Sequence, residues 1–243
     1  MTFLLCFIAK FSIIRKNRQG GCFTMQVILA STSPRRKEIF TTLGVSFTCV
    51  SPQVDETTDQ ISADQVTTEL ARRKADWVAD HLAAQGVDLT DTLIVAADTA
   101  VVHNMEILGK PTGPKNAFTM LKQLSGNSHF VVTGVCLKYN DKVVQATEMT
   151  RIQFAQMEDW QINAYVATGE PLDKAGGYGI QGIACMFAER IEGEYTNVVG
   201  FPVPLFTQML EQLDLTLIPG NGIVKLADLK KRKTPTPKRS KKA

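Results

Sequence analysis

The sequence predicts an α/β fold built on a mixed sheet, and three observations lead to this prediction. Short apolar runs suited to strands alternate along the chain with longer segments of helical periodicity. Two of the strand-like runs flank an Asn140-Asp141 turn and form a predicted hairpin, whereas the earlier runs are separated by helices. Neighbouring strands are therefore expected to be parallel in one part of the sheet and antiparallel in another. A body of roughly 200 residues can bury the core of one such domain, with one or two lobes.

The first half of the body is expected to hold three strands and two helices. The strands are an apolar run at 27–30, an alternating run at 45–50 and a second apolar run at 93–97. The first helix begins at Pro34, with Ser33 as its N-cap, and ends before Gly44. The second helix opens with the capping box Ser62-x-x-Gln65 and runs to about Ala84.

The second half combines the hairpin with further helices and a glycine-rich segment. Its expected elements are a helix at 114–124 stopped by Gly126, hairpin strands at 130–139 and 143–147, a helix at 158–167, short segments at 186–191 and 198–199, and a last helix at about 203–213. Glycines dominate between Gly169 and Gly182. No internal repeat interrupts this order.

Charge separates the body from the two ends of the chain. The first 24 residues hold four Lys and Arg, and residues 230–243 hold eight, and neither stretch has an acid. Residues 25–229 keep 15 basic and 24 acidic side chains, a net charge of −9. We therefore expect a domain at 25–218, an N-terminal extension at 1–24 upstream of a working start at Met25, and a basic disordered tail at 219–243. An acidic body that concentrates its cations favours a small anionic ligand over a broad nucleic-acid surface.

Cysteine and histidine usage bears on compartment and metal chemistry. The five cysteines form no CxxC pair, and the chain has only three histidines. Free thiols are typical of a reducing cytoplasm, so a cytoplasmic location is expected and a zinc site is not. The apolar stretch at 3–14 contains Lys10 and is too short to span a bilayer, so no membrane association is expected.

The stretch Ser31–Glu38 joins the first strand to the first helix and carries a basic first turn. A helix N-terminus presents N–H groups and partial positive charge, which favour phosphate. Arg35 and Arg36 oppose the dipole there, and a bound anion would relieve that conflict. The alternative is a basic turn that is simply solvated.

A second basic triplet, Arg72-Arg73-Lys74, lies on the second helix. Lys74 comes four residues after Leu70 and shares its apolar face, whereas Arg72 points the other way. A lysine on such a face either aims its ammonium at a specific group or extends along the apolar surface to reach water. Both interpretations stay open from the sequence.

Carboxylates follow two of the predicted strands. Asp98 is expected to close the strand at 93–97, and carboxyl ends of strands line ligand crevices in open α/β sheets. A carboxylate there can hold Mg²⁺ or take a proton from water. Its alternative role is to form a turn or a cap. Asp55-Glu56, after the strand at 45–50, would supply a second oxygen-rich edge for the metal.

Two further segments present polar groups from turns. Lys110 is held in Gly109-Lys110-Pro111, which is not a Walker A loop because Asn104 stands where that motif needs its first glycine. Gln181 is surrounded by glycines, which let a ligand approach the backbone closely. A glutamine can offer both a donor and an acceptor to a base edge. Either segment alone is weak evidence.

Taken in order, these motifs closely resemble the Maf family of nucleoside triphosphate pyrophosphatases. The matching segments are Ser-Thr-Ser-Pro-Arg-Arg at 31–36, Ala-Arg-Arg-Lys-Ala at 71–75, Ala-Ala-Asp-Thr at 96–99, Gly-Lys-Pro at 109–111, Leu-Ser-Gly-x-x-His at 124–129, Asp-Lys-Ala-Gly-Gly-Tyr-Gly-Ile-Gln-Gly at 173–182 and Asn-Val-Val-Gly-Phe-Pro at 197–202. The resemblance covers about residues 25–213. It implies an elongated mixed sheet with flanking helices and two lobes around a central cleft, similar to inosine triphosphatase. Some relatives have Ala where this chain has Gly177, which changes nothing in the comparison.

The resemblance also implies roles for individual residues. It places the catalytic carboxylate at Asp98 and the substrate contacts at Ser33, Arg36, Lys74 and Lys110. Its specificity positions correspond to Arg35, Thr99 and Gln181, which match the branch acting on dTTP and UTP rather than the branch acting on 7-methyl-GTP. From the chemistry of the residues, we expect Mg²⁺ or Mn²⁺ as the cofactor, held by Asp98 together with Glu56.

The implied activity is hydrolysis of dTTP and UTP to the nucleoside monophosphate and pyrophosphate, which removes unwanted nucleotides from the pool. Catalysis would depend on positioning and charge neutralisation. Family members commonly dimerise, so a homodimer is expected. The alternative is a nucleotide-binding regulator of cell division or septum formation with little turnover. A nucleic-acid-binding module has only the basic ends in its favour, and we expect at most weak contact through the tail.

Overall fold

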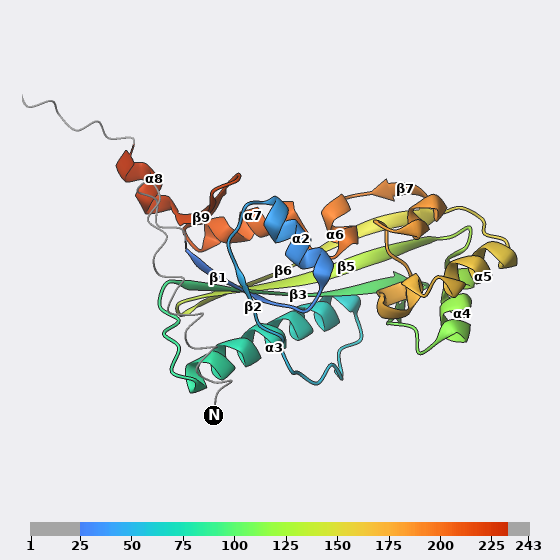
Figure 1. Ribbon diagram of the computed structural model, residues 1–243, viewed down its shortest axis with the longest axis horizontal. Coiled ribbons are helices and arrows are strands. Elements are labelled where there is room, and N and C mark those ends of the chain that lie inside the picture. The colour runs from blue at the N-terminus through green and yellow to red at the C-terminus, as the bar shows by residue number, and fades with distance from the viewer. Residues whose placement is uncertain (1–24, 233–243) are drawn as a thin grey trace, which may run out of the picture.

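The computed structural model of the chain describes residues 25–232, and its centre is one seven-stranded sheet (Figure 1). The strand order is β2-β1-β3-β5-β6-β7, and β4 pairs with β3 beyond the end of β1. The strands are β1 (Gln26–Ala30), β2 (Thr48–Cys49), β3 (Thr92–His103), β4 (Glu106–Leu108), β5 (Ser128–Tyr139), β6 (Lys142–Phe154) and β7 (Ala188–Glu192).

The sheet is mixed, as the sequence predicts. Strand β1 is parallel to both β2 and β3, whereas β3, β5, β6 and β7 are antiparallel in succession. The long strands β3, β5 and β6 have 12 to 13 residues each and run through the length of the molecule. They give the domain the elongated shape visible in Figure 1.

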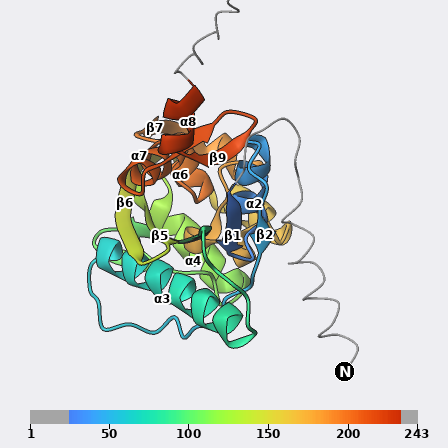
Figure 2. The ribbon, with the colours of Figure 1, turned by 90° about the vertical axis from the view of Figure 1, so that its left-hand side faces the viewer.

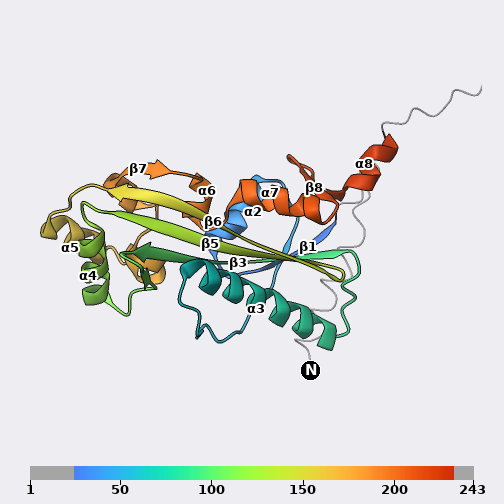
Figure 3. The same cartoon turned by 180° about the vertical axis from the view of Figure 1, so that it is seen from behind.

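Helices cover the two faces of the sheet to different extents. The helices are α2 (Pro34–Thr42), α3 (Ala63–Ala84), α4 (Pro114–Leu124), α5 (Asp159–Ala167), α6 (Tyr195–Val199), α7 (Val203–Gln212) and α8 (Leu226–Arg232). Figure 2 shows α3 on one side of the sheet and α7 on the other. Seen from behind, α3 lies along β3 at one end of the molecule, while α4 and α5 gather at the far end (Figure 3).

The close packing of α3 on the sheet depends on small residues where the helix contacts the strands. Ala71 and Ala75 are fully buried against Ala96 on β3 and Cys136 on β5. At Gly134 of β5 any side chain is excluded, because a Cβ there would lie 2.4 Å from the carbonyl carbon of Thr67 on the helix. The helix carrying Lys74 is thereby fixed directly over the middle of β3.

Separate apolar cores support the two ends of the molecule, which fits the expected two lobes. On the face opposite α3, Phe40 of α2 packs edge to face against Phe201, which lies in the turn before α7, with ring centroids 5.0 Å apart. At the far end, α4 and α5 pack on β5 and β6 around Phe154 and Leu121. The candidate site lies between these cores.

The structure corrects the expected extent of β3. The strand does not end at Ala97 but continues through Asp98 to His103, because antiparallel pairing with β5 persists from Leu93 to Val102. The parallel partner β1 stops opposite Ala96, and β4 begins to pair only at Val101. Residues 97–100 therefore form an open edge of β3, and Asp98 lies within the strand rather than at its end.

Smaller differences concern the second strand and the helix caps. The strand expected at 45–50 is reduced to Thr48–Cys49. Ser33 and Ser62 occupy the N-cap positions, but neither side chain makes a capping hydrogen bond. The Ser33 N–H instead donates to the hydroxyl of Ser31 at 3.1 Å.

The predicted domain boundary at 218 is wrong, because the fold continues beyond it. A second small sheet pairs β8 (Leu215–Ile218) with β9 (Gly222–Lys225), and α8 follows directly. Ile223 is buried in the core, and its carbonyl accepts from the Met25 N–H at 3.1 Å. The expected disorder of residues 219–232 is therefore not observed, whereas the extension at 1–24 and the segment 233–243 lie outside the described residues.

Two further expectations can be compared with the described part of the chain. Cys49, Cys136 and Cys185 are free thiols. Among residues 25–232, no helix has both the length and the apolar character needed to cross a membrane.

Candidate active site

A cavity of about 700 Å³ opens at the free edge of β3, between the two lobes. Its walls come from the exit of β1, from α2, from α3, from the turn after β4 and from the glycine-rich segment. The sequence-predicted residues in its lining are Ser33, Arg35, Arg36, Glu56, Lys74, Asp98, Thr99 and Lys110. Because side chains alternate along β3, Asp98 faces the α3 side of the sheet and Thr99 faces the α2 side.

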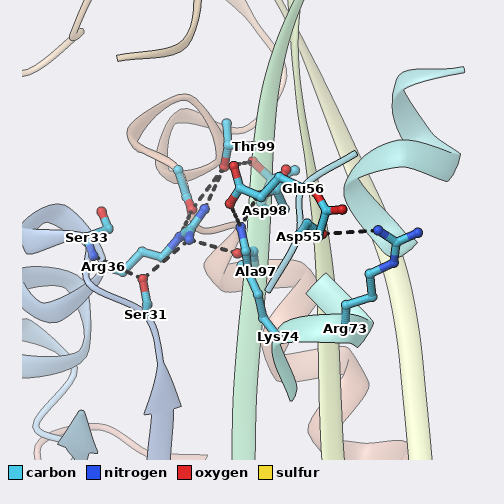
Figure 4. A network of polar contacts seen from close by, with 12 residues as sticks. Ser31, Ser33, Arg36, Asp55, Glu56, Arg73, Lys74, Ala97, Asp98 and Thr99 are labelled. Carbon is cyan, nitrogen blue, oxygen red and sulfur yellow. Dashed lines mark hydrogen bonds and ion pairs between the residues drawn. The ribbon is translucent and has the colours of Figure 1, made fainter. Parts of the chain in front are cut away.

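On the α3 side, Lys74 makes ion pairs with two carboxylates (Figure 4). Its Nζ lies 2.5 Å from Oδ1 of Asp98 and 2.8 Å from Oε1 of Glu56. The Lys74 side chain is only 12% exposed, so it aims at these partners rather than extending to water. The hydrogen bond from Lys74 also lowers the pKa of the Glu56 carboxyl below its ordinary value.

The loop that carries Glu56 is held by Arg73, a residue whose role no local sequence pattern predicts. Arg73 donates hydrogen bonds to the carbonyl of Asp55 at 3.1 Å and to that of Thr57 at 2.6 Å. These bonds fix the backbone on both sides of Glu56. The Asp55 carboxylate accepts from the Thr57 N–H and hydroxyl. Of the expected acidic pair, only Glu56 therefore reaches the cavity.

On the α2 side, Arg36 connects the middle of β3 to the residues that follow β1 and α6. Its Nε donates to the Gly200 carbonyl at 2.8 Å, Nη1 donates to the Ala97 carbonyl at 2.8 Å, and Nη2 donates to Oγ1 of Thr99 at 3.0 Å. A weaker contact of 3.4 Å joins Nη1 to the Ser31 hydroxyl. Burial lowers the pKa of the guanidinium. Arg36 thus fixes the open edge of β3 to the end of α6, and its contact with phosphate remains a prediction.

Beside Arg36, the N-terminus of α2 lines the cavity. The first turn of this helix contains no acidic residue, and its N-cap makes no side-chain hydrogen bond. Arg35 lines the cavity from that turn. This arrangement suits an anion, since both the helix terminus and the arginine present N–H donors.

The opposite wall is formed by the turn after β4 and by the glycine-rich segment. Lys110 lines the cavity as an exposed side chain, and the carbonyl of Gly109 accepts from the Gly176 N–H at 3.0 Å. Lys174 donates to the carbonyl of Glu170 and to the carboxylate of Asp173, each at 2.6 Å. Lys174 and Asp173 also line the cavity, a role that no pattern in the sequence predicts for them.

Besides Asp55, Gln181 is a predicted site residue that the cavity lining does not include. Its side chain is exposed and directly follows Ile180, which does line the cavity. The turn around it is held by Glu170, whose carboxylate accepts from the Ile183 N–H at 3.0 Å. A Cβ at Gly182 would lie 2.2 Å from that carboxylate, so a larger residue there would displace the Glu170 side chain from its contacts.

A buried pair supports this wall from behind. His129 on β5 is 1% exposed and lies 2.7 Å from the hydroxyl of Tyr178, which lines the cavity. Burial lowers the pKa of His129 to about 3 and raises the pKa of Tyr178. Both groups are therefore neutral near pH 7, and they position the wall rather than carry charge in it.

The charges around the cavity determine the chemistry it can perform. Arginine and lysine side chains approach from both lobes, and two carboxylates lie close together on the α3 side. Within residues 25–232, no three His, Cys, Asp or Glu side chains come together as a metal-binding group. A cation at Glu56 and Asp98 would therefore need ligands from an oxygen-rich substrate, such as a polyphosphate.

A family model and several named relatives match most of this chain. The family model described as Maf-like protein matches residues 26–213. Relatives named dTTP/UTP pyrophosphatase occur in Clostridium perfringens (strain SM101), 41% identical over 80% of this chain and 100% of that protein, and in Bacillus cereus (strain ATCC 10987), 40% identical over 82% and 95%. Another, from Geobacillus sp. (strain WCH70), is 41% identical over 77% and 98%. A solved structure, that of the Staphylococcus aureus Ham1 protein, aligns with a TM-score of 0.38 at 14% identity over 54% of this chain and 72% of that one.

Proposed function

The chain belongs to the Maf family, and from this premise we propose that it hydrolyses dTTP and UTP to the nucleoside monophosphate and pyrophosphate. One observation carries the proposal beyond family membership. The Lys74–Asp98 pair lies in a cavity of about 700 Å³ that also receives Arg35, Lys110 and the N-terminus of α2. This combination suits a triphosphate and a water molecule held beside a carboxylate.

In the proposed reaction, water attacks the α-phosphorus. A new bond forms between the water oxygen and that phosphorus, and the bond to the oxygen bridging the α- and β-phosphorus breaks. Pyrophosphate leaves with that bridging oxygen, and the nucleoside monophosphate keeps the oxygen from water. Asp98 is the proposed catalytic carboxylate. Lys74, Lys110 and the arginine-bearing turn neutralise the negative charge of the triphosphate.

The two carboxylates also fit the proposed Mg²⁺ or Mn²⁺. Glu56 and Asp98 both contact one ammonium group, so they lie close enough together to bracket a cation, and carboxylate oxygens are the ligands these ions prefer. When bound there, the metal would neutralise charge on the phosphate oxygens. The hydrogen bonds from Arg73 to the Glu56 loop keep the Glu56 carboxylate at this position.

The experiment incubates the purified full chain with UTP or dTTP and Mg²⁺ in water enriched in oxygen-18. We expect pyrophosphate to accumulate and the label to appear in the nucleoside monophosphate. Label in the pyrophosphate would place the attack on the β-phosphorus and contradict the proposed step. Tight nucleotide binding without pyrophosphate release would instead favour the regulator of cell division.

We also propose that the protein is a homodimer. Supporting this, a stripe of apolar side chains is exposed on the face of the sheet beyond the N-terminus of α3. Ile107 and Phe130 both pair with Val102 across neighbouring strands and are 37% and 39% exposed, and Met149 nearby is 58% exposed. Light scattering of wild type and Phe130→Asp tests the proposal, since the variant should be monomeric. A monomeric wild type would refute it.

A further inference from the structure

A buried pair of hydroxyl groups lies directly behind the cavity. Thr99 on β3 and Thr133 on β5 are paired in register, and their Oγ1 atoms are 2.9 Å apart. Thr99 lines the cavity, whereas Thr133 is 0% exposed and does not reach it. Thr133 is therefore positioned to act on the site only through its neighbour.

The Thr99 hydroxyl is committed to protein partners. Its oxygen accepts from Nη2 of Arg36 at 3.0 Å, and its single proton can go either to Thr133 or to the Gly200 carbonyl at 3.4 Å. Because a hydroxyl donates only one hydrogen bond, both choices leave Thr99 without a donor for the substrate. If Thr99 donates to Thr133, the Thr133 proton is directed to the carbonyl of Asn197 at 3.5 Å.

The same network leaves part of Arg36 available. A guanidinium has five N–H groups, and four of them meet the Gly200, Ala97, Thr99 and Ser31 oxygens. Among the described residues, one Nη2 N–H has no partner. The Thr99 hydroxyl holds the other N–H of that nitrogen, so it fixes the direction of the remaining donor.

We propose that Thr133 is a positioning residue for substrate binding and base choice, acting through Thr99 on Arg36 and Gly200. The inference rests on the proposed function and adds a residue outside the cavity to it. It also assigns to Thr99 an indirect role, in which its hydroxyl holds the arginine and the end of α6 rather than contacting the base. Asp98 faces the other side of β3 and is held by α3, so its geometry does not depend on this network.

The test compares three variants by their kinetics with UTP and GTP. Thr133→Val keeps the shape but removes the hydroxyl, and we expect a rise of about tenfold in KM for UTP, the scale of one hydrogen bond to a charged network, with little change in kcat. Discrimination between UTP and GTP should fall. Thr133→Ser restores the hydroxyl and should return KM to near the wild-type value. The matched control is Thr92→Val, because Thr92 on β3 is likewise buried and its hydroxyl has no hydrogen-bond partner among residues 25–232.

Dissociation constants for UTP measured in EDTA provide a readout that needs no turnover. We expect Thr133→Val to weaken UTP binding about tenfold and Thr92→Val to leave it unchanged. Unchanged KM, binding and base discrimination in Thr133→Val would overturn the inference, as would a lower melting temperature with wild-type kinetics. If Thr133→Val does not fold, Thr133→Ala is judged by the same criteria. A wild type that binds UTP but releases no pyrophosphate refutes the proposed function alone, and the binding comparison then decides the inference.

Discussion

The ammonium of Lys74 on α3 lies 2.5 Å from Oδ1 of Asp98 on β3, and the two side chains are only 12% and 16% exposed. The pair joins a helix on one face of the sheet to the open edge of the central strand. It forms there because β1 ends opposite Ala96, so the next residues of β3 have no neighbouring strand on that side. The candidate catalytic carboxylate and its counterion are thus placed by the topology of the sheet itself.

Replacing Asp98 with Asn should abolish turnover while nucleotide binding persists. The change removes the negative charge needed either to take a proton or to hold a metal, but it leaves the cationic groups around the cavity in place. We expect kcat for UTP to fall about a thousandfold, within the range for loss of a positioned acid or base. Calorimetry with UTP checks that binding remains. The control is Asp91→Asn, just before β3, where the carboxylate contacts Lys225 and the Tyr139 hydroxyl outside the cavity lining. Wild-type rates in Asp98→Asn would refute its catalytic assignment.

Replacing Lys74 with Ala should reduce activity without unfolding the protein. Loss of the ammonium removes the ion pairs with Asp98 and Glu56, and the Glu56 pKa should return toward its ordinary value. Glu56 is 59% exposed and can turn into water, which limits the loss of stability. Thermal melting and steady-state kinetics separate the two effects. A lower melting temperature with normal kinetics would show that Lys74 serves only the fold.

Local sequence patterns predict most of the fold but not the length of β3. The helices α2, α3 and α4 begin where Pro34, Ser62 and Pro114 indicate, because caps and prolines act locally. The polar residues Asp98 and Thr99 are typical of the end of a strand, but β3 continues beyond them because its pairing with β5 continues. Their polarity reflects the cavity at this edge rather than a turn.

The C-terminal hairpin could have been predicted from the sequence. Leu215–Ile218 and Ile223–Lys225 are apolar or alternating runs on either side of Pro219-Gly-Asn-Gly, which is a strong turn signal. The predicted domain boundary falls at 218, before this hairpin ends, because the residues that follow are rich in lysine and arginine. Composition identifies a charged tail, but it does not mark where the packed chain ends.

The candidate site is predictable in its charged residues and not in their supports. Lys74, Asp98 and Arg36 stand out because each breaks a local pattern. Arg73 and Thr133 do not, since their partners lie on other elements and only the three-dimensional fold brings them together. Gln181 shows the opposite case, because its motif is clear while its exposed side chain stays outside the cavity lining.

Protein stability should fall in mild acid because of His129. Its pKa is lowered from 6.5 to about 3 in the folded protein, so it stays neutral there while the unfolded chain takes up a proton below about pH 6.5. Falling pH therefore favours the unfolded state between these two values, and this group has no effect on stability above pH 6.5. Lowering the pH from 7 to 5 should cost about 2 kcal/mol through His129.

Urea unfolding of wild type and His129→Gln at pH 7 and pH 5 checks this prediction. The variant is expected to be less stable at pH 7, since it disturbs the contact with Tyr178, but to lose less stability on acidification. His81→Gln, at an exposed position on α3, should keep the wild-type pH dependence. Equal losses in wild type and His129→Gln would show that the histidine is not the group responsible.

Replacing Gln181 with Glu should lower activity on UTP far more than it lowers stability. A uracil edge presents the O4 and O2 acceptors around the N3–H donor, and a carboxylate has no N–H to give those acceptors. We expect kcat/KM for UTP and dTTP to fall at least about tenfold, because unpaired polar groups at a base edge are costly. The melting temperature should hardly change, since the side chain is exposed. Gln212→Glu, an exposed site at the end of α7, controls for the added charge.

Because Gln181 lies outside the cavity lining, an effect on UTP would mean that the turn held by Glu170 brings the Gln181 side chain to the substrate. Equal rates on UTP in wild type and Gln181→Glu would instead assign base choice to the residues that already line the cavity.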